Sequence, residues 1–300
     1  MTTNNGLLLI DKPQGITSHD VVARVRHELG ERRVGHAGTL DPMATGLLVL
    51  AVGPSTRLLR FAQSETKRYS GTVTFGIATD SLDADGQVLE RRPVPLLSEL
   101  AVNECASAMR GTQRQTPPMV SAIKVGGRRL HALAREGVEV ERAPREITIT
   151  DFSLRATETP EIWTFDVTCS VGTYVRVLLS DLAARLDTVG HLSSLRRLRS
   201  GDHDVSDAMT LLAFQQSLAQ GKDVIKSPRL FVSRLEHVTL SADEERRVRL
   251  GQHLVLAQAF GDDEIAALGE DSTLVGVLRR RGEKWKPQVV ITADARRESR

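Results

Sequence analysis

The sequence predicts an α+β chain with a large N-terminal domain and a small β-rich C-terminal domain. Two stretches, 67–75 and 162–171, alternate apolar and polar side chains as half-buried strands do. Apolar residues recur at helical spacing in 21–29, 97–110 and 175–186. After residue 230 the apolar segments become short and are separated by glycine and charged turns, which is typical of a compact β domain.

The composition is that of an ordinary globular protein. Of the 300 residues, 40% are hydrophobic and 26% are charged, which is enough to bury a core. No apolar run approaches the roughly 18 residues of a membrane span, and the N-terminus lacks the pattern of a signal peptide. We therefore expect a cytoplasmic protein. Cys105 and Cys169 lie far apart and no histidines are spaced as metal ligands, so we expect no metal site.

The charge is clustered although the net charge is only +2. Each basic run taken singly indicates a solvated face, but their number favours an RNA or DNA partner, because arginine offers a donor fork suited to phosphates. The runs are Arg32-Arg33, Lys67-Arg68, Arg128-Arg129, Arg279 to Arg281, and Arg196-Arg197 with Arg199. Beside the last of these runs, Leu192, Leu195 and Leu198 are in register.

The first elements are a short strand and a capped helix. Gly6 to Ile10 indicates a strand, and Asp11 to Gly15 indicates a turn. Thr17 and Asp20 form a capping-box pattern before an apolar stripe, and Gly30 can end the helix.

A glycine-rich loop at 34–46 is a candidate place for chemistry. Pro42 disfavours helical geometry at Asp41, so this carboxylate should stand on an ordered loop. The apolar segment 47–52 directly after it is either a buried strand or a short buried helix. Asp-Pro is also a common turn starter, so the loop alone leaves a plain turn as the alternative.

Tyr69 lies on the apolar face of the first alternating strand, together with Val73 and Phe75. The pattern is compatible with a core tyrosine as well as with a functional one. The acidic segment 80–86 lacks the remaining ligands of a calcium loop, so we interpret it as a solvated turn.

Residues 113–145 are basic and contain glycine without a strong core pattern. They suggest a projecting arm that meets an anionic partner. Residues 222–228 have the composition of a linker.

Arg176 follows the second alternating strand and stands in the first turn of a helix, at the edge of its apolar stripe. A positive charge is unfavourable at that end of a helix. The side chain therefore either extends to solvent or has an anion nearby, for which Asp41 is a candidate.

These motifs together resemble the TruB family of tRNA pseudouridine synthases. The resemblance covers nearly the whole chain, and less sharply its C-terminal segment. The matching segments are Asp11 to His19, Gly35 to Gly46, Lys67 to Tyr69, Gln115 to Met119, Ser121 to Lys124, Val171 to Arg176 and Leu195 to Arg197.

The resemblance implies a pseudouridine-synthase fold, in which helices flank a bent antiparallel or mixed sheet, followed by a PUA-like RNA-binding domain. It places the catalytic domain at 1–228, with an RNA-binding arm at about 113–145, and the PUA-like domain at 229–300. It implies an isomerase that converts uridine 55 in the T-loop of tRNA to pseudouridine without cofactor or metal. The partner would be tRNA, bound at its T-stem-loop and at its acceptor end through the C-terminal domain, with no obligate protein partner.

The resemblance also assigns roles to single residues. Asp41 would be the catalytic aspartate, Arg176 its partner, and Tyr69 would stack on the target base and could take the C5 proton. His36 would fill the space left by the flipped nucleotide, and Tyr174 and Leu195 would line the pocket. The remaining assignments are Lys12, Gly38 and Thr39 to substrate binding, and Met119, Lys124, Arg128 and Arg129 to the arm.

Some alternatives stay open. Asp41 could add to C6 of the base or trap C1′ of the ribose. Val120 and His131 stand where the family usually has aromatic residues, so the RNA contacts of the arm could differ. A guide-RNA-dependent rRNA synthase would share the Asp41 motif, but this chain lacks the long basic tails of that class. A tRNA-folding helper with dispensable catalysis is the other alternative.

Overall fold

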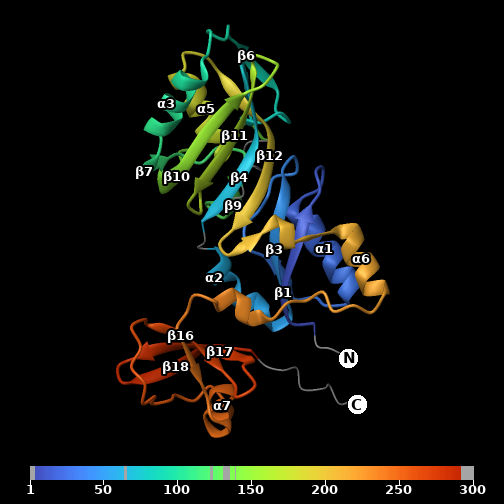
Figure 1. Cartoon of the computed structure of the whole chain (residues 1–300), viewed down its shortest axis with the longest axis vertical. Helices are drawn as coiled ribbons and strands as arrows, with labels where there is room; N and C mark the ends of the chain where they lie inside the picture. Colours follow the sequence, from blue (N-terminus) through green and yellow to red (C-terminus); the bar gives the residue numbers. More distant parts are fainter. Residues whose placement is uncertain (1–3, 64–65, 122–123, 131–135, 139, 292–300) are drawn as a thin grey trace.

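The computed structural model describes residues 4–63, 66–121, 124–130, 136–138 and 140–291. Figure 1 shows a long main sheet in the large domain, helices packed against it, and a separate small sheet near the C-terminus. The α+β prediction is confirmed.

The helices are α1 (Ser18–Leu29), α2 (Leu59–Gln63), α3 (Glu99–Ala108), α5 (Val175–Arg185), α6 (Leu211–Ala219) and α7 (Ala242–Arg249), with 3-10 turns η1 (Gly53–Leu58), η2 (Val205–Asp207) and η3 (Pro228–Val232). The strands of the large domain are β1 (Gly6–Lys12), β2 (Val34–His36), β3 (Thr45–Val52), β4 (Lys67–Phe75), β5 (Ile77–Thr79), β6 (Val88–Arg91), β7 (Gly111–Gln115), β8 (Lys124–Val125), β9 (Arg128–Arg129), β10 (Arg145–Ala156), β11 (Ile162–Cys169), β12 (Gly190–Ser200), β13 (His203–Asp204) and β14 (Met209–Thr210). The small sheet contains β15 (His237–Thr239), β16 (Glu264–Leu268), β17 (Leu274–Arg281) and β18 (Lys284–Val290).

The main sheet is mixed and has two halves that meet at a short junction. Its order is β14-β1-β3-β12-β4-β11-β10-β7, with β2 beside β3 and β13 beside β12. Strands β3 and β12 pair in parallel at only two positions, Arg196 with Thr45 and Arg197 with Gly46. Gly46 has φ 97°, and a Cβ there would lie 2.3 Å from the carbonyl oxygen of Arg197, so only glycine fits. This junction places the Asp41 loop between the two halves.

Strands β1 and β3 are covered on both faces. Leu8 and Ile10 pack with α1 and α6, whereas Leu7 and Leu9 face η1, η3 and the small sheet. A strand that is buried on both sides is continuously apolar. This explains the unbroken run at 47–52, which is a strand and not a short helix.

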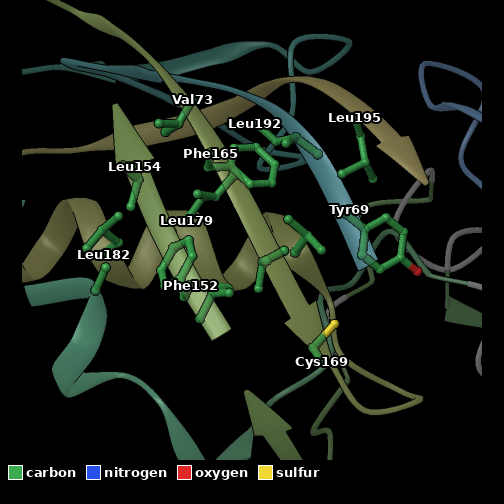
Figure 2. Close-up of a cluster of buried hydrophobic side chains, with 14 of the residues drawn as sticks. Tyr69, Val73, Phe152, Leu154, Phe165, Cys169, Leu179, Leu182, Leu192 and Leu195 are labelled. Carbon is green, nitrogen blue, oxygen red and sulfur yellow. The ribbon is translucent and has the colours of Figure 1, made fainter. Parts of the chain in front are cut away.

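The half of the sheet that contains β4, β10 and β11 packs against α3 and α5 (Figure 1). Figure 2 shows Val73, Phe165 and Phe152 of the strands in one apolar cluster with Leu179 and Leu182 of α5. The alternation predicted for both strands is confirmed for 67–75 and for 162–169. The second strand was expected to reach Val171, but it ends at Cys169, and Val171 is exposed in the turn that follows.

Helix α1 begins and ends as predicted. The Thr17 side chain accepts the Asp20 amide while the Asp20 carboxylate accepts the Thr17 amide, so the capping box is formed. Gly30 closes the helix with φ 62°, in the left-handed region.

The leucines of 191–199 lie on strand β12, which contains register shifts between Leu192 and Ser194 and between Arg197 and Arg199. A β-bulge adds one residue to one strand, so Leu192 and Leu195 are both buried although three positions separate them. Arg197 also points inward and is 1% exposed.

The small sheet has the order β15-β16-β17-β18 and a core that includes Trp285 and Val248 of α7. Its other face packs against β1, β3 and η3 in a shared apolar cluster. The segment expected to be a linker is attached to β1, since Leu7 and Lys226 exchange backbone hydrogen bonds of 2.9 and 2.8 Å. The predicted boundary after residue 228 falls at the start of η3 and stays a prediction.

The predicted arm leaves the main sheet at its edge. Its two ends are neighbours, because Gln115 at the end of β7 pairs with Arg145 at the start of β10. Between them the described residues include the short hairpin β8–β9.

Candidate active site

A cavity of about 700 Å³ lies where the Asp41 loop, the start of α5 and the ends of β4 and β12 come together. The fold thus brings to one place residues from four separate motifs. The predicted site residues that line it are Gly38, Thr39, Asp41, Tyr69, Tyr174, Arg176 and Leu195.

The loop that carries Asp41 is fixed at several points. The Ser18 hydroxyl donates to the Leu40 carbonyl at 3.1 Å and accepts the Leu40 amide at 2.8 Å. The Gly15 amide donates to the Pro42 carbonyl at 2.9 Å. The Asp41 side chain itself is 40% exposed. It is therefore an accessible carboxylate on a rigid loop, as the sequence predicted.

Arg176 is almost entirely buried, with 4% of its side chain exposed, so it does not extend to solvent. Its Nη2 lies 3.1 Å from Oδ2 of Asp41, and it donates to the Val120 carbonyl at 2.8 Å. Nη1 donates to the Ser81 carbonyl at 2.7 Å. The predicted pairing of Arg176 with Asp41 is therefore present in the structure.

Arg176 has a second acidic partner, and here the sequence interpretation was wrong. Asp83 is 5% exposed, and its Oδ2 lies 3.4 Å from Nη1 of Arg176. The segment 80–86 was expected to be a solvated turn, but it folds back onto β12. The Ala84 amide donates to the Leu192 carbonyl and the Leu192 amide to the Leu82 carbonyl. The turn therefore supplies a buried carboxylate that pairs with Nη1 of Arg176, while Asp41 pairs with Nη2.

Tyr69 stands at the edge of the main apolar cluster. Figure 2 shows its ring beside the core and its hydroxyl pointing away from the labelled core residues. Only 8% of the residue is exposed, and burial is the main reason that the pKa of its hydroxyl is raised. The ring can contact a base from the cavity wall, and the hydroxyl is neutral in the resting site.

Tyr174 is held by the root of the predicted arm. The Gln115 side chain accepts the Tyr174 amide at 2.7 Å and donates to the Tyr174 carbonyl at 3.1 Å. Ser121 interacts with the Tyr174 hydroxyl, whose pKa is raised mainly by burial. Ser121 is thus part of the cavity wall and Gln115 supports Tyr174 from outside it, roles that neither residue was assigned from the sequence.

Lys12 is fully buried and does not line the cavity. Its Nζ donates to the carbonyls of Pro13, Ile16 and Pro42 at 2.9, 2.7 and 3.3 Å. Pro42, the third of these acceptors, is the residue directly after Asp41. Any contribution of Lys12 to substrate binding would therefore act through the position of the loop.

Replacing Lys12 by methionine should change the pH dependence of stability. Burial lowers the pKa of Lys12 from 10.5 to about 8. Between these values the native protein binds fewer protons than the unfolded chain, so the free energy of unfolding should rise with pH across that window. Lys12→Met should lack this rise, and at neutral pH it should lose about 1–3 kcal/mol because buried carbonyls lose their donor.

Urea unfolding measured from neutral pH to pH 10.5 checks this expectation. Lys222→Met, at an exposed position, serves as the control. Parallel pH curves for the parent and Lys12→Met would contradict the assignment.

His36 lies on β2 and is not among the residues that line the cavity. Burial is the main reason that its pKa is lowered to about 4, with the nearby His19 charge as the next cause. The ring is therefore neutral at physiological pH, and it meets the ring of His19 edge to face at 5.5 Å. Its proposed role, to fill the space of a flipped nucleotide, stays a prediction.

The predicted arm residues are only partly visible. Arg128 is exposed and pairs with Glu136. Lys124 and Arg129 lie opposite each other in the β8–β9 hairpin, and Met119 is half-buried. Val120 is 36% exposed, and His131 lies outside the described residues.

Four cationic side chains line the cavity, Lys67, Arg145, Arg176 and Arg197, against the single carboxylate of Asp41. The sequence analysis grouped Arg197 with a solvated basic run. No signal in neighbouring residues could have placed it inside, because its burial depends on the pairing of β12 with β4. The surplus of positive charge suits a polyanionic ligand.

The described residues contain no cluster of His, Cys, Asp and Glu side chains that could hold a metal ion. No helix in the described part of the chain is both long and apolar enough to cross a membrane.

The fold is that of pseudouridine synthases. It matches a chain in the solved structure of an H/ACA RNP bound to a substrate RNA containing 2'-deoxyuridine, with TM-score 0.71, 20% identity, and coverage of 96% of this chain and 85% of the other. It also matches a chain in a Cbf5-Nop10-Gar1 complex, with TM-score 0.67, 22% identity, and coverage of 91% and 78%. At these identities the likeness concerns the fold alone.

Sequence comparison identifies the family. Residues 26–175 match the model of the TruB family pseudouridylate synthase N-terminal domain. The tRNA pseudouridine synthase B of Leifsonia xyli is 42% identical over 299 residues, which cover 97% of both chains. The tRNA pseudouridine synthase B of Thermobifida fusca is 41% identical, and the match covers 96% of this chain and 98% of the relative. That of Streptococcus pneumoniae is 39% identical, and the match covers 96% of this chain and 100% of the relative. The chain belongs to the TruB family of pseudouridylate synthases, and it is an isomerase.

Proposed function

We propose that this protein converts uridine 55 in the T-loop of tRNA to pseudouridine, with Asp41 as the nucleophile. Relatives that carry the name tRNA pseudouridine synthase B match along almost their whole length, which supports tRNA as the substrate. The observation that carries the proposal is the accessible Asp41 carboxylate held by the buried Arg176 at the wall of the cavity.

The chemistry fits these groups. The reaction breaks the bond between C1′ and N1, turns the uracil, and forms a bond between C1′ and C5. It has no redox step and no hydrolysis, and on this proposal the side chains themselves supply the catalysis. A base enters the cavity only if it leaves its stack, at a cost of a few kcal/mol. Asp41 would then attack C6 of the base or C1′ of the ribose.

The surroundings of the cavity would bind the rest of the RNA. The cationic wall, including Lys67 and Arg145, can neutralise phosphates of the T-stem-loop. We place the arm of residues 113–145 against the T-loop and the domain of residues 229–300 against the acceptor end. On this proposal the protein works alone in the cytoplasm on free tRNA.

The decisive experiment measures tritium release from a T-stem-loop transcript that carries C5-tritiated uridine only at position 55. Purified protein, without guide RNA or another protein, should release the label and form pseudouridine at that position. A transcript labelled at a different T-loop uridine is the matched control and should retain its label. No release from the position-55 transcript would overturn the proposal, and release only in the presence of a guide RNA would favour the guide-dependent alternative.

A further inference from the structure

Arg197 is a buried cation that the proposed chemistry does not use. It is 1% exposed, yet it is among the residues that line the cavity. Its Nε donates to the Leu47 carbonyl at 2.7 Å, and its Nη2 and Nη1 donate to the carbonyls of Gly38 and Thr39 at 3.2 and 3.5 Å. The guanidinium thus joins β12 to β3 and to the loop that leads to Asp41.

Arg197 differs from Arg176 in its charge balance. Arg176 lies within 4 Å of two carboxylates, whereas Arg197 forms no ion pair with any residue that the structure describes. A buried charge without a counter-ion costs free energy in the folded protein. Such a cost is tolerated most readily where an anion appears during function.

The neighbour of Arg197 at the cavity is Tyr69. The two residues are directly opposite each other in the antiparallel pair of β12 and β4, so their side chains lie on the same face. The Arg197 guanidinium acts to lower the pKa of the Tyr69 hydroxyl, against the larger effect of burial, which raises it. The other groups that act on the Tyr69 hydroxyl are Asp41 of the loop and Cys169 of β11, and both disfavour the phenolate, whereas Arg197 favours it.

We propose that Arg197 is a positioning residue that stabilises Tyr69 as a phenolate, so that Tyr69 can take the proton from C5 of the target uracil. This inference rests on the proposed function of the site. Its proton balance closes within the cavity. The C1′–N1 bond breaks with its electron pair on the base, the Tyr69 hydroxyl gives its proton to N1, and the phenolate takes the C5 proton once C1′ and C5 have joined. Tyr69 ends as a neutral phenol and N1 carries the proton found in the product.

The composition of the chain allows a direct test. Tyr69 and Tyr174 are its only two tyrosines, and both line the cavity. Fluorotyrosine incorporated into the Tyr174→Phe variant therefore labels Tyr69 alone, and fluorine makes the hydroxyl more acidic, so that it titrates while the protein is folded. The ¹⁹F resonance then reports the ionisation of Tyr69 without RNA.

In this background Arg197→Met should move the titration of the fluorinated Tyr69 to higher pH, because the phenolate loses the cation that lies opposite it on β12. Arg197→Lys should stay closer to the parent, since it keeps the charge. Arg196→Gln is the matched control on the same strand, because Arg196 pairs with Asp11 instead, and it should leave the titration unchanged. An unchanged midpoint in folded Arg197→Met would overturn the proposal.

Single-turnover rates on the T-loop transcript provide the second readout. Arg197→Met should slow this step roughly 100-fold while RNA affinity stays within about tenfold of the parent, because proton transfer is lost and binding is not. Circular dichroism checks that the variant is folded. An equal loss in binding and in rate would indicate a purely structural role and would overturn the proposal.

A measurement without any change at Arg197 covers the case in which Arg197→Met does not fold. With fluorotyrosine at position 69 the pH profile of the single-turnover rate should move to lower pH than that of the unlabelled Tyr174→Phe protein. Identical profiles would overturn the role of Tyr69 as the proton acceptor. Tritium release by the unlabelled parent tests the proposed function. The RNA-free titration tests the effect of Arg197 on Tyr69, so the two hypotheses can fail separately.

Discussion

Replacing Asp41 by asparagine is expected to abolish turnover and to leave tRNA affinity within about tenfold of the parent, some 1.4 kcal/mol. The amide has the shape of the carboxylate but cannot act as a nucleophile at carbon. Since Asp41 is held by the surrounding loop and not by its own side chain alone, the cavity should keep its form. Tritium release and filter binding on the same transcript measure the two quantities.

Asp151→Asn provides the control for this experiment. Asp151 is an exposed carboxylate that pairs with Arg110 on the surface, and it is not among the residues that line the cavity. Its variant should turn over at the parental rate. Turnover above about one per cent of the parent in Asp41→Asn would exclude a nucleophilic Asp41. Rescue of a deletion strain by Asp41→Asn would instead show that a tRNA-folding role suffices in the cell.

The second large effect is expected for Arg176→Lys, with turnover reduced roughly 100-fold or more. The guanidinium of Arg176 serves four acceptors at once, namely Asp41, Asp83 and the carbonyls of Ser81 and Val120. A single ammonium cannot span these directions, although it keeps the charge. The Asp41 carboxylate would lose its fixed orientation, and the Val120 carbonyl at the root of the arm would lose its donor.

Arg185→Lys is the matched control, because it makes the same substitution in the last turn of the same helix at an exposed position. Steady-state kinetics on the tRNA transcript, together with thermal unfolding, distinguish lost catalysis from lost stability. Near-parental kinetics in Arg176→Lys would remove the ion pair from the mechanism.

The local elements were accessible from the sequence because they follow from side-chain periodicity and from backbone preferences. The alternation at 67–75 and the capping box of Thr17 and Asp20 each involve neighbours in the chain. Asp41-Pro42 defined an ordered loop in the same way, since proline restricts the residue before it.

The burial of two charged side chains could not be predicted from neighbouring residues in the sequence. Asp83 looks like part of an acidic surface turn, and it becomes buried only because that turn bonds to β12. Arg197 looks like part of a basic run, and the bulges of β12 turn it inward. In both cases the deciding hydrogen bonds join segments that are far apart in the sequence.

By itself the sequence determined the α+β class, the family resemblance and the aspartate loop, because strand and helix periods, turns and motifs depend only on residues that are close together in the chain. The tertiary structure decided which charges meet: among the described residues it set two carboxylates around Arg176 and none around Arg197, and it placed Tyr69 opposite Arg197. The physical reason is that the energy of a charge depends on burial and on neighbours within a few ångströms, and both are fixed only when distant strands pair.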